Sequence, residues 1–335
     1  MHNARSSFGR PSAVLLALLL VLGSVAAVAQ TVTPGSFSFE TIEAPGALAT
    51  EASDIDKRGT VVGYTVDASG GTTGFLYDGA FTPFSIAGYE GTTIIGTNDK
   101  GALVGDVADA SGTLHGYLSV DGEVTIYTAA GSDLTIALDV NKKNQVVGFY
   151  RTPANQRFAF LAEDDAFSSF SAPGAGPLGT RASGINKRGE ISGVFFDADG
   201  TARGFVRRKN GTFKTIDFPG SAGTFLGRIS NKGRVVVGSY LDANFQFRGF
   251  VRDGDGDFVT FDPPGAAGTF AVGLARDGRI VGSYDDANQP GRTVGFIATP
   301  LAAYDYLDDM NASPSDDDDD SDSDDSDSDD DDSDD

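Results

Sequence analysis

Hydrophobic positions between residues 37 and 299 fall in short runs of about 5 to 7 residues that are rich in Val, Ile, Phe, Tyr and Thr. Clusters such as Asp-Ala-Ser-Gly and Pro-Gly separate the runs, and these residues form tight turns. No window of a dozen residues keeps a helical period between capping residues. The pattern therefore predicts an all-β domain over residues 30–299.

The runs belong to a repeat, because three signatures recur in a fixed order. An aromatic-led or Val-led segment, often closed by Pro-Gly, begins at residues spaced 42, 43, 43, 46 and 45 apart: Phe39, Phe81, Val124, Phe167, Phe213 and Phe258. A turn followed by an apolar run that ends in Gly opens at these positions: Asp56, Asn98, Asn141, Asn186, Asn231 and, with Arg in the Asn place, Arg276. A Gly-aromatic-aliphatic strand begins at these positions: Gly74, Gly116, Ala159, Gly204, Gly249 and Gly295. The chain thus carries six copies of one unit of 42–46 residues.

Each copy contains four strand-like segments, which in the first copy are residues 50–55, 60–66, 73–77 and 81–86. Four strands in a unit of this length match one blade of a β-propeller. Stacked immunoglobulin-like domains would need about 100 residues each. We predict a six-bladed β-propeller with four antiparallel strands per blade.

The phase of the repeat predicts how the ring closes. The last copy has no fourth strand, because the chain turns into a linker at Pro300, whereas an unmatched strand at residues 37–43 precedes the first copy. We expect this N-terminal strand to complete the last blade and so remove the open sheet edges. A solenoid that does not close is the alternative.

The N-terminus is typical of a cleaved signal peptide at residues 1–29. Arg5 and Arg10 precede an apolar run, and Ala27-Val28-Ala29 is a small-x-small cleavage site before Gln30. The most apolar stretch is nearer 10 residues than the roughly 20 of a spanning helix. We therefore expect an exported protein (extracellular, on the cell surface or periplasmic) with no membrane span after cleavage.

The C-terminus is predicted to be a linker at residues 300–314 and a disordered tail at 315–335. Every tail residue is Asp or Ser, and 15 of the last 20 are Asp. Such a block repels itself and has no apolar surface to bury. It is either a solvating tail or a loose binder of divalent cations or of a basic partner.

Charge and composition exclude several functions. The net charge is −23, from 25 Lys and Arg against 48 Asp and Glu, but 18 of the acids are Asp residues at or after Asp305. The rest of the chain is only mildly acidic, and this balance argues against nucleic-acid binding, which needs a concentrated basic face. The absence of Cys and the presence of only two His exclude disulfides, thiolate metal sites and, in practice, a Ser/His/Asp triad.

The repeat resembles the bacterial HAF-type extracellular repeat family over about residues 36–298. The resemblance rests on the Asn-x-x-Gly-x-Val-Val-Gly-x-Tyr segment, the Gly-Phe-Leu strand and Phe-x-Thr-Ile-Asp-x-Pro-Gly. It implies an exported bacterial protein but no particular activity. The His that often precedes Gly-Phe in this family is present here only at His115; the other copies carry Thr73, Phe158, Arg203, Arg248 and Val294. A ring of histidines is thereby excluded.

Catalysis needs residues that differ between the copies of the repeat, and in propeller enzymes such residues usually lie on the innermost strands. The equivalent inner pairs are assigned as follows: Ser53/Asp54, Ile95/Gly96, Leu138/Asp139, Ser183/Gly184, Arg228/Ile229 and Gly273/Leu274. Asp54 and Asp139 could act as paired carboxylates, with Arg228 binding an anionic group. Because Gly and aliphatic residues fill most of the set and no histidine is near, a hydrolase with its site in the channel mouth is the weaker alternative.

Calcium is the one cofactor that the sequence suggests. Alternating acids at Asp197 and Asp199, and at Asp253, Asp255 and Asp257, look like fragments of calcium loops, but neither is followed by a bidentate Glu. Similar Asp-Gly stretches recur at the same hairpin of other copies, which favours plain turns. A calcium-stabilised cell-surface module stays as an alternative.

Basic residues recur at one turn of the repeat: Lys57-Arg58, Lys142-Lys143, Lys187-Arg188 and Lys232. They would form a basic rim on one face, onto which the acidic tail could fold. Taken together, the sequence predicts a monomeric, exported, non-enzymatic binding or scaffold module whose partner is an unknown glycan or protein.

Overall fold

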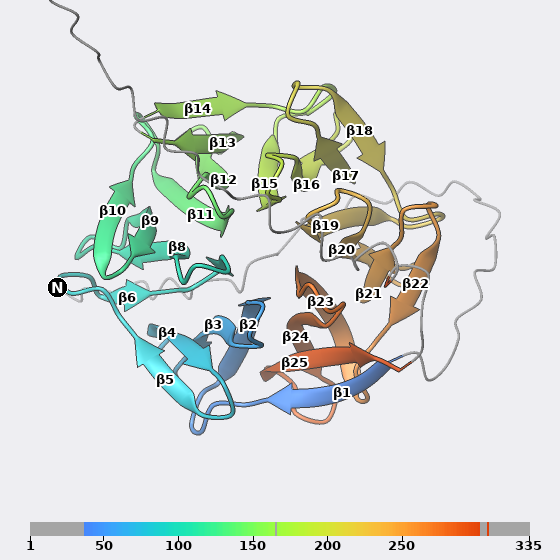
Figure 1. The fold of residues 1–335 in the computed structure, drawn as a ribbon, viewed down its shortest axis with the longest axis horizontal. Coiled ribbons are helices and arrows are strands. Elements are labelled where there is room, and N and C mark those ends of the chain that lie inside the picture. Colours follow the sequence, from blue (N-terminus) through green and yellow to red (C-terminus); the bar gives the residue numbers. More distant parts are fainter. Residues whose placement is uncertain (1–36, 165, 302–306, 308–335) are drawn as a thin grey trace, which may run out of the picture.

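The computed structural model describes residues 37–164, 166–301 and 307. The predicted signal peptide and the Asp/Ser tail lie outside the described residues, as does the linker apart from residues 300, 301 and 307. The described chain forms antiparallel strands arranged in a ring around a central axis (Figure 1). This confirms the prediction of an all-β, propeller-like fold.

Each repeat folds as an up-and-down meander whose first strand lies nearest the axis. The first repeat comprises β2 (Ala49–Ile55), β3 (Val61–Val66), β4 (Thr72–Tyr77) and β5 (Phe81–Phe84). In the second repeat the inner strand is broken in two, giving β6 (Gly91–Thr92), β7 (Gly96–Thr97), β8 (Leu103–Ala108), β9 (Leu114–Val120) and β10 (Glu123–Tyr127). The third comprises β11 (Leu134–Val140), β12 (Val146–Arg151), β13 (Arg157–Glu163) and β14 (Ala166–Phe170).

The later repeats follow the same order. The fourth comprises β15 (Thr180–Ile185), β16 (Ile191–Phe196), β17 (Ala202–Arg207) and β18 (Phe213–Ile216). The fifth comprises β19 (Gly223–Ile229), β20 (Val236–Leu241), β21 (Phe247–Arg252) and β22 (Phe258–Phe261). The sixth has β23 (Ala266–Leu274), β24 (Ile280–Asp286) and β25 (Thr293–Pro300), and β1 (Phe37–Ile42) pairs antiparallel with β25 from Phe37↔Pro300 to Ile42↔Gly295.

A glycine–aromatic pair explains why two of the sequence signatures always occur together. The Gly that ends the apolar run of the second strand lies opposite the aromatic residue of the third strand: Gly63↔Phe75, Gly105↔Tyr117, Gly148↔Phe160, Gly193↔Phe205, Gly238↔Phe250 and Gly282↔Phe296. All six aromatic side chains are buried. A Cβ on Gly63 would meet the Glu51 carbonyl oxygen and would lie 2.8 Å from the Phe75 ring, so only glycine fits beside the aromatic residue here.

The residue that precedes the Gly-aromatic pair of the third strand stabilises the turn between the second and third strands. His115 bonds to Asp109 at 3.0 Å and to Thr128 at 2.8 Å. Arg203 and Arg248 occupy the same position, and each contacts the Asp of its own turn and an Asp after the fourth strand: Asp197 and Asp217 for Arg203, Asp242 and Asp262 for Arg248. His115 is therefore a structural brace.

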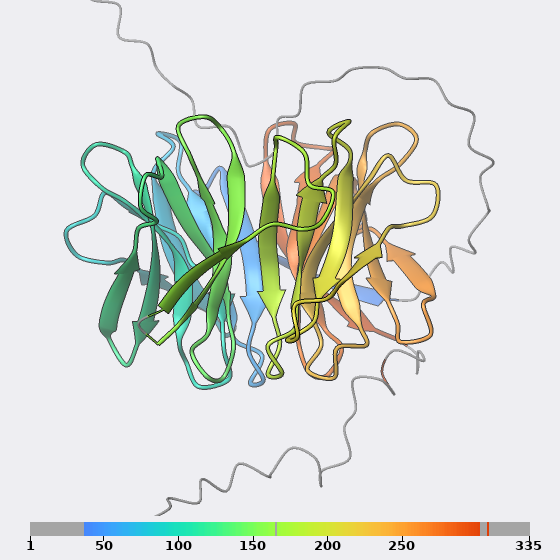
Figure 2. The same ribbon diagram turned by 90° about the horizontal axis from the view of Figure 1, so that it is seen from above.

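Alternating strand direction gives the ring two distinct faces (Figure 2). The turns between first and second strands lie at one face, here called the mouth face, and the turns between second and third strands lie at the other. The basic residues noted in the sequence belong to the mouth face.

Candidate functional site: the channel and its mouth

The inner strands turn their last residues toward the axis through a bulge. The register with the second strand shifts near the end of β2, β11, β15, β19 and β23, and the second repeat breaks its inner strand at the same place. A bulge re-aims the side chain that follows it. The residues at this position alternate around the ring between charged side chains and glycine: Asp54, Gly96, Asp139, Gly184, Arg228 and Gly273.

This alternation corrects two of the inner pairs assigned from sequence. In the fifth and sixth repeats the equivalent pairs are Gly227/Arg228 and Val272/Gly273, one residue earlier than Arg228/Ile229 and Gly273/Leu274. The assignment slipped because Asn231 and Arg276 were taken as the residues that open the turns, whereas Ser230 and Ala275 open them. With the correct register, every second repeat presents a glycine to the axis.

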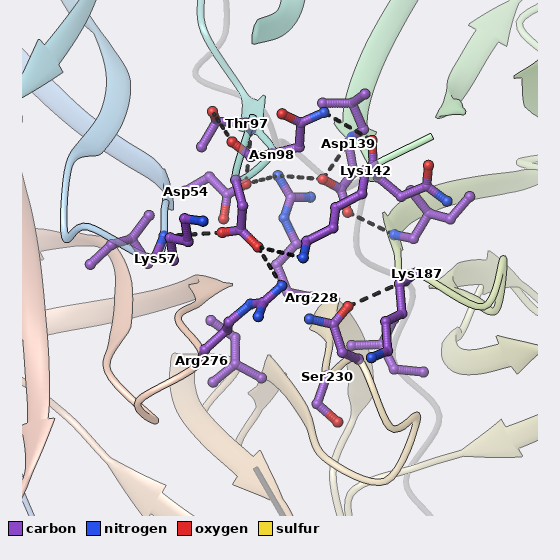
Figure 3. A pocket seen from close by; sticks show the side chains of 18 residues that line it. Asp54, Lys57, Thr97, Asn98, Asp139, Lys142, Lys187, Arg228, Ser230 and Arg276 are labelled. Atoms are coloured by element: carbon purple, nitrogen blue, oxygen red, sulfur yellow. Dashed lines mark hydrogen bonds and ion pairs between the residues drawn. The ribbon is translucent and has the colours of Figure 1, made fainter. Parts of the chain in front are cut away.

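Asp54, Asp139 and Arg228, here called the channel cluster, meet at the axis (Figure 3). Arg228 Nη2 lies 3.1 Å from Asp54 Oδ2 and 3.4 Å from Asp139 Oδ1. The same guanidinium donates to three main-chain carbonyls of other repeats: Ile95, Leu138 and Ser183. One side chain of the fifth repeat thus links the first four.

The carboxylates are also held by main-chain amides of neighbouring repeats. Asp54 Oδ2 accepts from the Thr97 amide at 3.0 Å, and Asp139 Oδ2 accepts from the Ile185 amide at 2.7 Å. The exposed fractions are 4% for Asp54, 4% for Asp139 and 8% for Arg228, so water does not screen these interactions. The cluster closes the channel and ties the repeats together.

The glycines of the alternation make room for the cluster. A Cβ on Gly96 would lie 2.8 Å from Arg228 Nη2 and 2.7 Å from the Leu138 carbonyl oxygen. A Cβ on Gly273 would meet Val281 Cγ2 and would lie 3.0 Å from the Asp54 Cα. Real Cβ atoms do not approach other heavy atoms so closely, and a side chain at either position would displace the cluster.

Burial dominates the electrostatics of the cluster. It raises the pKa of Asp139 to about 7, against the attraction of Arg228 and with a further contribution from the charge on Asp54. Burial also disfavours the charge on Arg228, but attraction to Asp139 and Asp54 outweighs it and raises the pKa of Arg228 above its usual value. Two carboxylates share one guanidinium, so a proton on Asp139 would make the cluster neutral.

The predicted roles of these three residues do not fit this geometry. Arg228 was expected to bind an external anion, but its Nη groups are engaged by the two carboxylates and three carbonyls. Asp54 and Asp139 were expected to act as paired carboxylates, yet Asp54 accepts from Arg228, Asp139 forms an ion pair with it, and both accept from main-chain amides. The structure therefore brings the three together as an internal ion cluster.

The turns of the mouth face enclose a cavity of about 90 Å³ (Figure 3). The channel cluster contributes Asp54, Asp139 and Arg228 to its lining. In each repeat the turn residue at this cavity lies three positions after the residue that faces the axis. Each repeat thus also contributes the residue after the one that opens its turn: Lys57, Asp99, Lys142, Lys187, Asn231 and Arg276. We call these six residues the mouth ring. It holds four cations against the single acid Asp99.

Asp99 organises part of the mouth ring. Its Oδ2 lies 2.6 Å from Arg276 Nη2 and 3.9 Å from Lys142 Nζ, and its Oδ1 accepts from the Lys57 amide at 3.1 Å. The side chains of Lys142 and Arg276 remain 27% and 32% exposed. A concave site with excess positive charge and access to water concentrates anions.

A chain of side-chain amides fixes the turns that carry the ring. Each Nδ2 donates to the carbonyl of the equivalent residue in the next repeat: Asn98 to Asn141 at 2.9 Å, Asn141 to Asn186 at 3.1 Å and Asn186 to Ser230 at 3.1 Å. The turn-opening residues of the last two repeats are therefore Ser230 and Ala275, one position before the predicted Asn231 and Arg276. Asp99, Asn231 and Arg276 were missed as mouth residues. Only the place of Asp99, directly after the recognised turn-opening Asn98, is visible in the sequence.

The acids proposed as calcium ligands are used inside their own turns. Asp197 Oδ1 accepts from the Asp199 and Thr201 amides, both at 3.0 Å. Asp253 Oδ1 accepts from the Gly256 and Asp257 amides, both at 2.8 Å. Within residues 37–164, 166–301 and 307, no three His, Cys, Asp or Glu side chains gather to hold a metal. Asp255 joins no such group, and the hairpins have the geometry of plain turns.

A second cavity of about 290 Å³ lies between the first and second repeats. Apolar side chains of the second and third strands, Val62, Leu76 and Leu103, form part of its wall. Arg58 and Asp56, which form an ion pair at 3.4 Å, lie at its edge. Its lining contains no residue of the mouth ring or of the channel cluster.

The part of the chain that the structure describes has no helix of the length and apolarity needed to cross a membrane. Comparison with known proteins adds no family. No protein-family model matches the chain. No curated protein matches it either.

Solved structures share the fold at low identity. The SapL1 lectin in complex with α-methyl fucoside is 13% identical, with a TM-score of 0.53 over 76% of this chain and 96% of the lectin. A protein of unknown function from Dyadobacter fermentans is 13% identical, with a TM-score of 0.50 over 79% of this chain and all of that one. A putative TolB from Agrobacterium tumefaciens is 15% identical, with a TM-score of 0.49 over 75% of this chain and 91% of its own. The likeness extends to the propeller-like fold alone.

Proposed function

We propose that this chain is an exported, non-enzymatic binding module whose mouth ring takes the anionic group of a glycan. The observation that supports this most strongly is the separation of charges in the centre of the ring. The channel cluster is buried at the inner end of the cavity, where both carboxylates pair with Arg228, whereas the mouth ring three residues away is partly exposed and cationic. Membership in the HAF-type repeat family stays part of the proposal.

The same separation argues against a hydrolase in the channel mouth. Acid–base catalysis by two carboxylates needs space for a water or substrate between them and at least one acid free to move a proton. Asp54 and Asp139 instead share a buried guanidinium, and no histidine lines the cavity. A calcium-stabilised module lacks a ligand set among the described residues.

The size of the mouth favours a charged substituent over a whole sugar. A cavity of about 90 Å³ is well below the 300–1,000 Å³ typical of small-molecule pockets. A carboxylate or sulfate group would enter the mouth while the rest of the chain lies across the turns. The glycan class is favoured because a lectin solved with a fucoside has a similar fold.

Paired oligosaccharides that differ only in charge test the proposal. Calorimetric titration of the full chain with a sulfated heparin-type octasaccharide should show binding that weakens steeply with salt, because its anions replace counterions at the mouth. The fully desulfated, N-acetylated and carboxyl-reduced octasaccharide should show none. Equal binding of both forms, or binding of neither, would overturn the anionic-glycan assignment. Tighter binding of a poly-Glu peptide of the same charge would assign the mouth to a protein ligand.

We also propose that the six repeats are six blades and that β1 completes the last one. The pairing of β1 with β25 supports this, as does the contact of Phe37 with Phe261 in the fifth repeat at a centroid distance of 4.8 Å. If β1 closes the ring, Phe37→Ala should destabilise the fold by about 3–5 kcal/mol, as for other buried Phe residues. Val124→Ala, at a 40% exposed site, is the matched control. Equal, small effects in chemical denaturation would refute closure by β1.

A further inference from the structure

The described chain leaves the ring at the mouth face. In β25, Ala298 pairs with Ile280, and Ile280 follows directly after the turn that carries Arg276. β25 ends two residues later, at Pro300. The residues that follow therefore start beside the mouth ring and not at the opposite face.

The chain is still in contact with the ring six residues beyond Leu301. Leu307 packs against the apolar cluster that contains Phe37, Val235 and Phe261. From Leu307 to Ser315, where the Asp/Ser segment begins, eight residues can span at most about 26–29 Å. The distance from β25 to the axis is the sum of two strand spacings and the radius of the channel. This distance is on the order of 20 Å. The tether is long enough to place residues 315–335 over the mouth.

Charge complementarity favours that position. The segment 315–335 contains only Asp and Ser, and 15 of its last 20 residues are Asp. The mouth ring has four cations and one acid, and Asp99 already shows how a carboxylate contacts Arg276 and Lys142 there. A tethered segment also has an effective concentration in the millimolar range for such a short linker, which makes even weak contacts effective.

We infer that the Asp/Ser tail binds the mouth ring of its own chain and competes with external anions for it. The inference concerns the same site as the proposed function and rests on the cationic character of that site, but it needs no external ligand to be tested. The tail would screen the mouth at low salt and would yield to a polyanion that makes more contacts. Only a ligand with enough negative charge to displace the tail would then bind the mouth ring.

Energy transfer between two single labels tests the inference directly, because the chain has no Cys of its own. One label is placed in the tail at Ser328→Cys. The other is placed at an exposed turn of the second repeat, at the mouth face with Lys100→Cys or, as the control, at the opposite face with Ala110→Cys. Single-molecule detection selects the molecules that carry one donor and one acceptor, and exchange of the two labels between the sites leaves their distance unchanged.

We expect higher transfer to position 100 than to position 110 at low salt, and loss of that excess in about 1 M NaCl, where the Debye length is about 3 Å. The substitutions K57Q/K142Q/K187Q remove three of the four mouth cations. They should abolish the excess of energy transfer to position 100 over position 110. Equal transfer to the two faces at low salt, or an excess that survives the mouth substitutions, would overturn the inference. Transfer that appears only between molecules at high concentration would also overturn it, since the tail would then bind a second copy. Failure of the glycan titration alone would leave this result unaffected.

Discussion

The channel cluster and the mouth ring lie three residues apart at the ends of the same six inner strands. The charges of the cluster are paired with one another, whereas the ring has an excess of positive charge. At the first position the side chains alternate between charge and glycine, are buried, and satisfy one another and the main chain. At the second position there is no alternation, the side chains are partly exposed, and positive charge is in excess. Because a buried charge without partners is costly, the charges of the cluster are paired with one another and with main-chain groups, whereas the ring carries an excess of positive charge.

Loss of Arg228 should separate the two sites most sharply. Arg228→Met would leave Asp54 and Asp139 buried without their counter-charge, which costs about 3–5 kcal/mol of unfolding free energy. Chemical denaturation measures this loss. The triple variant D54N/D139N/R228M has no buried charge in the cluster and should recover much of the stability. A fully stable R228M protein would show that the cluster does not hold the ring together.

The glycine alternation can be broken without any change of charge. Gly273→Ala would bring a Cβ against Val281 Cγ2 and place it 3.0 Å from the Asp54 Cα and 3.1 Å from the Ser53 carbonyl oxygen, and overpacking of this kind costs about 1–3 kcal/mol. Gly268→Ala in the same strand is the matched control, because its nearest neighbour would be 3.5 Å away. Thermal unfolding should show a lower midpoint for the first variant only. Equal midpoints would mean that the channel tolerates a side chain there.

The raised pKa of Asp139 predicts a pH dependence of stability. Its pKa rises from the ordinary value of 3.8 to about 7 in the folded state, so between these values the folded chain binds more protons than the unfolded one. Stability should therefore fall as pH rises from about 4 to 7, by on the order of 1–3 kcal/mol from this group. Asp139→Asn should remove that part of the slope in denaturation curves measured across this range. Burial also raises the pKa values of Glu51 and Asp262, so some slope of the same sign should remain. An unchanged slope in the variant would contradict the burial of a proton-binding Asp139.

The repeat made much of the fold predictable from sequence. Regular spacing, turn residues and Gly-aromatic pairs recur in every copy, and they give an all-β array and place Asp54, Asp139 and Arg228 on inner strands. The alternation with glycine was not visible, because the pairs in the fifth and sixth copies were displaced by one residue. Bulges shift the register by one, and a one-residue error moves every side chain to the other face.

The mouth ring was only partly predictable for a related reason. The recurring Lys57, Lys142 and Lys187 were seen as a basic rim, but the place of Arg276 depended on recognising Ala275 as the residue that opens its turn. Ala275 has no side-chain acceptor, and so the turn signal is lost at that point in the sequence. Asp99, the one acid of the ring, is set apart by its contacts with Arg276 and Lys142, which join distant repeats.

The most direct test compares two sets of three mouth-face cations in the heparin-type octasaccharide titration. K57Q/K142Q/K187Q removes cations that line the cavity, and K100Q/K143Q/R188Q removes equal charge from the next residue of the turn in three repeats, outside the cavity. Both variants should keep their stability to within about 0.5 kcal/mol per site, as is usual for surface substitutions. We predict that the first set weakens binding about tenfold or more, at roughly 0.5–1 kcal/mol per lost contact, and that the second set has a much smaller effect. Equal weakening by both sets would contradict the account, because binding would then depend on net charge and not on the mouth ring.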